Sequence, residues 1–160
     1  MEDFPNLVIS RTFSKAYGLA GLRVGYSASS SYIADYLNRV RQPFNVNSLA
    51  LVAAESALKD DEHLEKCLRI NKDEKERLYK FFISHGYDYI ESFANFVSFE
   101  SKDNSNKVFK SLLPKAVIAR SMEIYKMPNH LRVTIGLHEE NSIFMESLTS
   151  LSESWYGTFI

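Results

Sequence analysis

The segment SRTFSKAYGLAGLRVGY, residues 10–26, determines how the rest of the sequence is interpreted. It follows the apolar, β-branched run NLVIS, which predicts a buried strand over residues 6–10. Three of the six glycines of the chain lie within the segment, and residues 23–26 at its end predict a second short strand. Lys15 therefore lies in a loop between two predicted strands, among small and apolar residues.

This loop combines one amine with several groups that bind phosphate. A lysine kept from water has its ammonium form destabilised, and the free amine is the form that attacks a carbonyl to give a Schiff base. Thr12 and Ser14 are two positions apart, so an extended chain directs both hydroxyls to one side. Arg23 can return to the same place through the glycine turn, and two hydroxyls with a guanidinium suit a phosphate dianion. The segment predicts a site for a cofactor that carries both an aldehyde and a phosphate.

Outward from this segment, predicted helices and strands interleave, which is typical of α/β or α+β proteins. Apolar spacing predicts a long helix that begins near Asp60 as an N-cap and ends at Gly86 as a left-handed C-cap. Residues 27–31 are expected to form a loop or the start of a helix. Further helices are predicted around residues 32–40, 49–56, 108–113 and 139–151, and strands over 96–99, 116–119 and 131–135.

The last predicted strand has two different faces. Leu131, Val133 and Ile135 alternate with polar residues, so one face is expected to join the core. Arg132 points away from that face and can reach a cleft, although a surface ion pair is the alternative for an isolated arginine. Arg120 lies at the edge of another predicted strand and could assist it.

Composition excludes several classes of function. The chain has 19 basic and 20 acidic residues and a net charge of −1, which argues against nucleic acid or an acidic membrane as the main partner. Its single cysteine, Cys67, fits a reducing, cytoplasmic compartment. The four histidines lack the spacing of metal ligands, so no metal site is expected. The sequence also lacks a G-x-S-x-G motif and any apolar run of about 18 residues.

Residues 10–26 resemble the cofactor-lysine segment of the fold-type I pyridoxal-phosphate aminotransferases, and within them that of the histidinol-phosphate aminotransferases. A second match, NHLRVTIG at residues 129–136 with EEN at 139–141, resembles the "LRITVG…EEN" end of that family. Residues 94–97 and 118–120 fit the small-domain strands of the family less specifically. The resemblance covers essentially the whole chain.

The resemblance implies pyridoxal 5′-phosphate as the cofactor and gives a role to each site residue. Lys15 would form the Schiff base with the cofactor and would then move a proton during catalysis. Thr12, Ser14 and Arg23 would hold the cofactor phosphate. Arg132 would bind the anionic end of the substrates, a carboxylate or a phosphate.

The implied reaction is transamination between L-histidinol phosphate and 2-oxoglutarate, a step of histidine biosynthesis. The implied partners are therefore small-molecule substrates and a second copy of the chain, because family members work as dimers. Neither nucleic acid nor a membrane is expected as a partner.

The sequence departs from the family pattern in two respects. Leu137 follows Gly136 where the family usually has Thr or Ser, which predicts the loss of a helix cap worth about 1 kcal/mol. Lys15 lies near the start of the chain, whereas in the family it lies beyond the midpoint. The chain is therefore expected to be the C-terminal portion of the enzyme and to be inactive, or nearly so, on its own.

On this interpretation, residues 1–41 are a remnant of the large cofactor-binding domain, at the edge of its sheet, and residues 42–160 form the small α+β domain. Strands in the first part would lack their sheet partners, so their apolar side chains would be exposed.

Three alternatives to this function remain open. Within the same fold, the parent enzyme could be a threonine-phosphate decarboxylase-like enzyme or an aromatic amino-acid aminotransferase. Outside enzymology, the chain could be a non-catalytic module, aminotransferase-like in structure, that serves a structural or sensor role.

Overall fold

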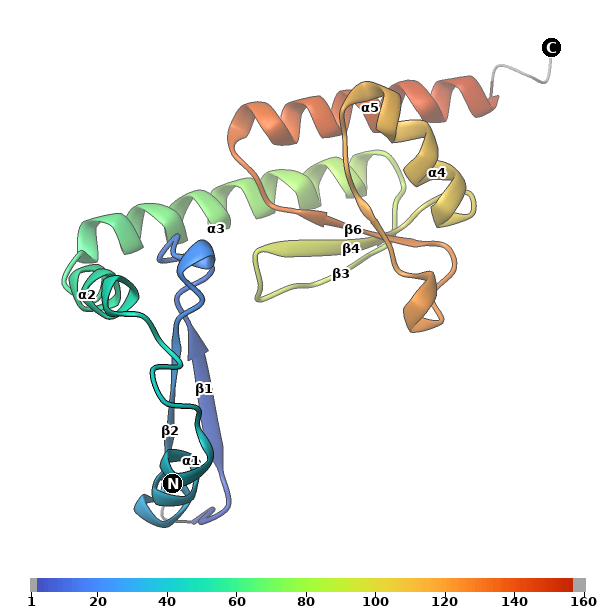
Figure 1. Ribbon diagram of the computed structural model, residues 1–160. Coiled ribbons are helices and arrows are strands. Elements are labelled where there is room, and N and C mark those ends of the chain that lie inside the picture. The colour runs from blue at the N-terminus through green and yellow to red at the C-terminus, as the bar shows by residue number, and fades with distance from the viewer. Residues whose placement is uncertain (1–2, 157–160) are drawn as a thin grey trace. The chain divides into compact units, whose positions relative to one another are not determined.

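The computed structural model describes residues 3–156, and the chain divides into two compact units, residues 1–68 and 69–160 (Figure 1). The division falls inside one long helix, so each unit is described by itself. The boundary predicted at residues 41 and 42 concerns the domains of a larger enzyme, and it stays a prediction. Within residues 3–156, no helix combines the length and the apolar character needed to cross a membrane.

The first unit is built on an antiparallel pair of strands, β1 and β2. Both strands predicted around the lysine segment are therefore present. The prediction of a loop or helix start at residues 27–31 is wrong for residues 27–29, because they continue β2 and pair with β1. The elements of this unit are β1 (Val8–Thr12), the 3₁₀ helix η1 (Ala20–Leu22), β2 (Gly25–Ser29), α1 (Ser31–Val40), α2 (Ser48–Ala57) and the start of α3 (Asp61–Ser84).

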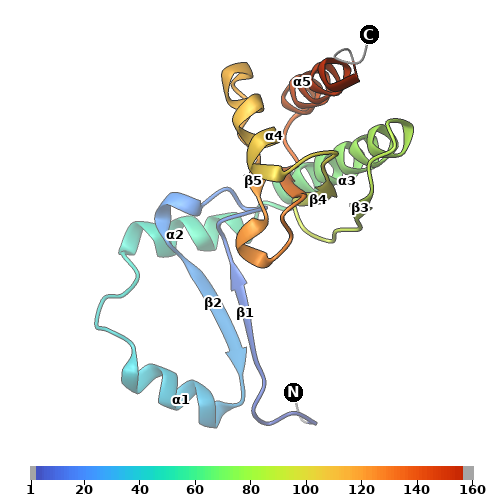
Figure 2. The same cartoon turned by 90° about the vertical axis from the view of Figure 1, so that its right-hand side faces the viewer.

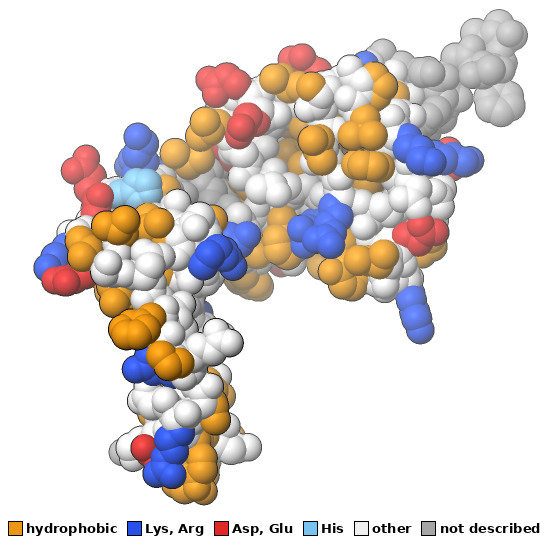
Figure 3. Space-filling model, in the orientation of Figure 1, with side chains coloured by type: hydrophobic (Ala, Val, Ile, Leu, Met, Phe, Trp, Pro, Cys, Tyr) orange, Lys and Arg blue, Asp and Glu red, His pale blue; other side chains and the backbone are white. Residues whose placement is uncertain are grey.

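The predicted burial of the first strand is wrong. All five side chains of β1 are exposed, because a two-stranded ribbon without a covering layer buries neither of its faces. This exposure confirms the separate expectation that apolar strands without sheet partners would be open to solvent. Figure 3 shows apolar side chains at the surface of this unit. The exposed apolar residues include Val40, Leu49 and Val52.

A small apolar cluster attaches the lysine loop to α2. Phe13 and Val24, one at each end of the loop, are buried against Ala50 and Ala54 of α2. Phe13 retains only 3% of its accessible surface. The loop is thus fixed at its base, and Tyr17, Leu19 and Leu22 within it also pack against the cluster.

The second unit is a four-stranded antiparallel sheet with the strand order β3-β4-β6-β5. Figures 1 and 2 show α3 and α5 side by side over one face of the sheet. Phe82 of α3, Phe99 of β4 and Leu148 of α5 are fully buried together in the core. The remaining elements are β3 (Tyr89–Ile90), β4 (Phe96–Glu100), α4 (Ser105–Leu112), the 3₁₀ helix η2 (Leu113–Lys115), β5 (Arg120–Ser121), the 3₁₀ helix η3 (Glu123–Tyr125), β6 (His130–Thr134) and α5 (His138–Tyr156).

Most predicted elements of this unit are present, and one is misplaced. Asp60 caps the long helix by accepting a hydrogen bond from the His63 N–H at 3.0 Å, and Gly86 has the predicted positive φ of 66°. The strand predicted at residues 116–119 is wrong, because β5 comprises only residues 120 and 121. Val117 and Ala119 are apolar because they are buried in the core as a loop, without strand pairing.

Leu137 directly precedes α5 and carries no hydroxyl, so the predicted loss of a hydroxyl cap stays a prediction. Glu140 accepts a hydrogen bond from the Leu137 N–H at 2.7 Å, which is half of a capping box. Asn141 accepts a second one from the Gly136 N–H at 3.1 Å. These two side chains bind the backbone N–H groups just before the helix, whereas a hydroxyl at position 137 would bind an N–H inside its first turn.

Candidate active site

The loop that carries Lys15 is closed by backbone hydrogen bonds at three levels. The Phe13 N–H donates to the Val24 carbonyl at 3.2 Å and extends the β1–β2 ladder by one step. The Leu19 N–H donates back to the Phe13 carbonyl, and the Gly18 N–H donates to the Lys15 carbonyl, both at 2.9 Å. Lys15 is consequently the first residue of a tight turn, and the loop backbone holds it in a defined place.

Two glycines make this loop possible for different reasons. Gly18 has a φ of 71°, a conformation that other residues adopt only with strain. Gly25 lies opposite Thr12 in the ladder, and a Cβ at position 25 would come within 2.6 Å of the Arg11 carbonyl oxygen. The two strands can approach this closely beside the lysine loop only because Gly25 has no side chain.

We expect Gly25→Ala to open the hairpin beside the lysine loop. The added methyl group meets rigid backbone, and overpacking of this kind destabilises by about 1–3 kcal/mol. Amide hydrogen exchange of the β1 and β2 residues should become about 5- to 150-fold faster, as that free energy implies. Gly21→Ala is the control, since a Cβ there has no neighbour within 4 Å. Equal exchange rates in the two variants would contradict this role of Gly25.

The predicted phosphate-binding groups all lie at the loop end of the hairpin. The ladder pairs Thr12 with Gly25, so Ser14 and Arg23 lie at facing positions just beyond it. The Thr12 hydroxyl accepts from the Ser14 N–H at 3.1 Å, which leaves its own proton for a ligand. The Arg23 guanidinium donates one N–H to the Ala20 carbonyl at 2.7 Å, which leaves its other N–H groups for a ligand. These donors, with an amine in the same loop, fit a group that carries an aldehyde and a phosphate.

The water-poor environment predicted for Lys15 is wrong for this chain. Lys15, Thr12 and Arg23 are exposed, and Ser14 is half-buried. The cause is the same as for β1, because no element among the described residues of this unit, 3–68, covers the loop from outside. The structure therefore brings the four predicted groups together without removing them from solvent.

Arg132 belongs to the second unit, and its predicted orientation is confirmed. It lies half-buried in β6 between the buried Leu131 and Val133, on the sheet face opposite the core. Its neighbours across the strands are Ser98 of β4 and Arg120 of β5. Two like charges directly opposite each other destabilise a sheet, and an anion bound by both would relieve the repulsion.

Arg120 is therefore a further candidate for this surface, which the sequence suggested only as a residue that could assist Arg132. The available signal was its place in the weak match at residues 118–120, but the misplaced strand at 116–119 concealed its register. Only the observed pairing with Arg132 shows that both guanidinium groups belong to one surface.

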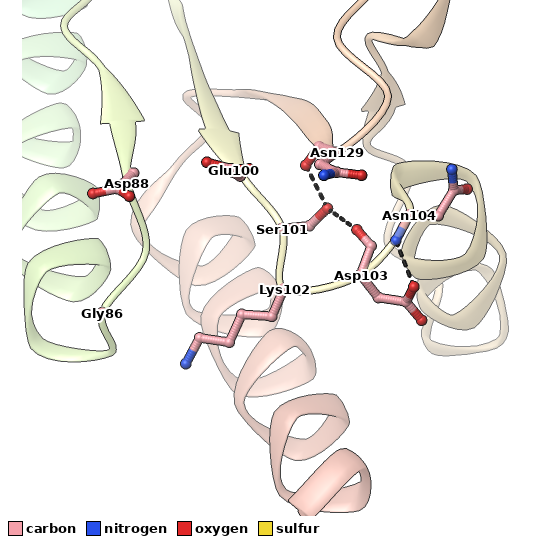
Figure 4. A pocket seen from close by; sticks show the side chains of 8 residues that line it. All are labelled: Gly86, Asp88, Glu100, Ser101, Lys102, Asp103, Asn104 and Asn129. Atoms are coloured by element: carbon pink, nitrogen blue, oxygen red, sulfur yellow. Dashed lines mark hydrogen bonds between the residues drawn. The ribbon is translucent and has the colours of Figure 1, made fainter.

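A separate polar pocket of about 500 Å³ contains none of the predicted site residues (Figure 4). The Ser101 hydroxyl donates to the Asn129 and Asp103 carbonyls, and the Asp103 carboxylate accepts from the Asn104 N–H. This backbone hydrogen bond is the main reason that the pKa of Asp103 lies below its usual value, with Lys107 as a lesser cause. The polar groups of the pocket are thus explained by hydrogen bonds that connect the β4–α4 loop to the start of β6.

The family model, the relative and the solved structures described here, which all match this chain, are all aminotransferases. The family model for aminotransferase class I and II matches residues 1–148. Histidinol-phosphate aminotransferase 1 from Nitrosococcus oceani is 49% identical over 155 residues, which are 97% of this chain and 42% of that protein. This chain therefore spans about two fifths of the length of that relative.

Two solved structures extend these matches. The histidinol-phosphate aminotransferase from Clostridium acetobutylicum is 25% identical with a TM-score of 0.88, over 96% of this chain and 48% of that one. The histidinol-phosphate aminotransferase from Sinorhizobium meliloti, solved in complex with pyridoxal-5′-phosphate, is 25% identical with a TM-score of 0.82, over 93% and 43%.

Proposed function

Because this chain belongs to the aminotransferase class I and II family, we propose that it is part of a histidinol-phosphate aminotransferase. The intact enzyme transfers an amino group between L-histidinol phosphate and 2-oxoglutarate. The observation that carries this proposal is the lysine loop, where one amine and three phosphate donors lie at the same end of one hydrogen-bonded hairpin. The identity of about one half with a protein named for this reaction supports the choice of substrate.

Pyridoxal 5′-phosphate is the cofactor that this donor set suits. The Thr12 and Ser14 hydroxyls and the Arg23 guanidinium would hold its phosphate by charge-assisted hydrogen bonds. When bound, the cofactor supplies an electron sink for the negative charge that develops at the substrate Cα.

Lys15 performs the proton transfer in this proposal. Its Nζ, as the free amine, takes the proton from the substrate Cα and later returns a proton, which is general acid–base catalysis. Such an amine must be shielded from water, whereas Lys15 is exposed in the structure, which describes residues 3–156. We therefore propose that parts of the enzyme outside this chain cover the loop, and that the 160 residues alone are inactive.

Arg132 and Arg120 bind the anionic end of the substrates. A guanidinium offers parallel N–H donors that match a carboxylate or a phosphate, and two of them supply the charge for a dianion. The cross-strand pairing of these arginines gives both a common surface, which is why we include Arg120.

We expect Arg132→Gln and Arg120→Gln each to raise the KM for histidinol phosphate in the intact enzyme. Loss of one charged hydrogen bond weakens binding by about 10- to 100-fold. The control is Lys110→Gln, which removes an exposed positive charge from α4 in the same unit. A KM that changes equally in all three variants would show only a general charge effect and would remove both arginines from the site.

The proposed reaction is tested by incubating the intact enzyme with L-histidinol phosphate and 2-oxoglutarate and measuring glutamate. Preferred turnover of an aromatic amino acid, or release of CO₂ from threonine phosphate, would replace this function with one of the two enzymatic alternatives. Absence of turnover with every substrate would favour the non-catalytic module. A rate of about 1 per second or more from the 160 residues alone would contradict their proposed inactivity.

We also propose that the intact enzyme is a homodimer in the cytoplasm. Exposed apolar side chains in the first unit, among them Leu49 at 76% and Val52 at 64%, offer a surface that a second copy could cover. The single cysteine suits a reducing compartment. Sedimentation of the intact enzyme at micromolar concentration measures the proposed stoichiometry.

A further inference from the structure

The guanidinium of Arg132 lies over an aromatic ring on the neighbouring strand. Its central carbon is 4.7 Å from the centroid of the Phe96 ring, which is within the range of a cation–π interaction. Both side chains are half-buried, so water screens this contact less than it would at an open surface.

The register of the sheet explains why these two side chains meet. Arg132 lies directly opposite Ser98, and Phe96 precedes Ser98 by two positions, so all three share the face away from the core. Phe96 is thus the diagonal neighbour of Arg132, at a spacing that long and aromatic side chains can bridge. Ser98 is only 7% exposed beneath them.

The Arg132 guanidinium is repelled by one neighbour, yet it must stay beside that neighbour for both to bind an anion. Arg120 lies directly opposite on the other side and repels it, while an anion must find both guanidinium groups in place. The Phe96 ring holds Arg132 from the β4 side without using any of its N–H donors, because the attraction acts through the ring face. All five donors therefore stay available for the ligand.

We propose that Phe96 is a positioning residue for the anion site, which keeps the Arg132 guanidinium in the orientation that binds a carboxylate or phosphate. This inference rests on the proposed function for the identity of the ligand. It adds that anion binding requires an aromatic ring at position 96 as well as Arg132. An aliphatic residue of similar size would pack against the sheet but would leave Arg132 free to turn away from Arg120.

The test uses the 160-residue chain with ¹⁵N-labelled arginine, Phe96→Leu as the variant and inorganic phosphate as the probe. A ring beneath the guanidinium shifts the Arg132 Nε–H resonance upfield, and Phe96→Leu should remove this shift. Phosphate binding measured from the same resonance should weaken by about threefold to tenfold. The spectrum itself reports whether the variant is folded.

Two further variants make the result specific. Phe96→Tyr keeps the ring and should restore both the shift and the affinity, whereas a merely structural need for phenylalanine would not be rescued. Phe93→Leu changes a fully exposed ring in the β3–β4 connection and should have no effect. An unchanged Arg132 resonance in Phe96→Leu would overturn the inference. Failure of the unmutated chain to bind phosphate would overturn the anion site of the proposed function, while the resonance shift would still decide the role of Phe96.

Discussion

Replacing Lys15 with arginine in the intact enzyme is expected to abolish transamination. Arginine keeps the positive charge but remains protonated at every accessible pH, so it can neither attack an aldehyde nor accept a proton from the substrate Cα. Loss of the proton transfer alone should lower kcat by about 10²- to 10⁴-fold. In parallel, reduction with borohydride in the presence of pyridoxal phosphate should no longer place a covalent label on the peptide that contains position 15.

Two measurements separate this role from a structural one. Lys15→Ala should regain part of its activity when a small primary amine is added, because the free base can replace the missing Nζ. Lys66→Arg, at an exposed position of α3, should retain full activity and full labelling of Lys15. Label spread over many lysines of the unmutated enzyme, or a Lys15→Arg enzyme with near-normal kcat, would contradict the assignment.

Local sequence features predicted only an α/β or α+β protein, whereas the family resemblance predicted the fold type I architecture that the solved relatives confirm. Capping at Asp60 and the left-handed Gly86 were predictable because both depend on neighbours a few residues away. Alternation likewise predicted the orientation of Arg132, since a strand repeats every two residues whatever its partners. The family resemblance added the cofactor and the roles, which no periodicity could supply.

The errors share one physical cause, which is that burial depends on residues far away in the sequence. The apolar run at residues 7–9 predicted a buried strand, but β1 has only β2 beside it and no covering layer. Residues 116–119 have a strand-like composition because Val117 and Ala119 enter the core, yet their backbone pairs with no strand. The like-charge pair of Arg120 and Arg132 could not be predicted without the register between β5 and β6.

A buried carboxylate is the other feature that the sequence did not reveal. Glu74 occurs in a helix rich in charged residues, where a solvated side chain is the natural expectation, yet only 8% of it is exposed. Its oxygens accept hydrogen bonds from Asn141 at 2.8 Å, from His138 at 2.9 Å and from Arg77 at 3.1 Å. Asn141 in turn binds the backbone of Gly136, so one carboxylate of α3 secures the connection between β6 and α5.

Glu74→Ala is therefore expected to destabilise the second unit by about 2–4 kcal/mol. The variant leaves one of the two N–H donors of the buried Asn141 amide without its acceptor and removes the partner of Arg77 and His138. Urea unfolding followed by circular dichroism measures the change. The matched control is Lys107→Ala, which breaks an ion pair of the same unit with side chains 72% and 40% exposed. That pair should contribute far less than Glu74, because water screens it.

The contribution of Glu74 should also depend on pH in a defined direction. Burial by itself would raise the pKa of Glu74, but the three hydrogen bonds and the charge of Arg77 lower it below the usual 4.5. Because the pKa is lower in the folded state, the stabilisation is complete above the unfolded pKa of about 4.3 and is lost as pH falls through the folded value. As pH falls below the usual pKa of a glutamate, the native chain should therefore lose stability faster than Glu74→Ala. Parallel curves over that range would mean that the carboxylate gains nothing from its partners, and the Glu74→Ala effect would then be one of packing alone.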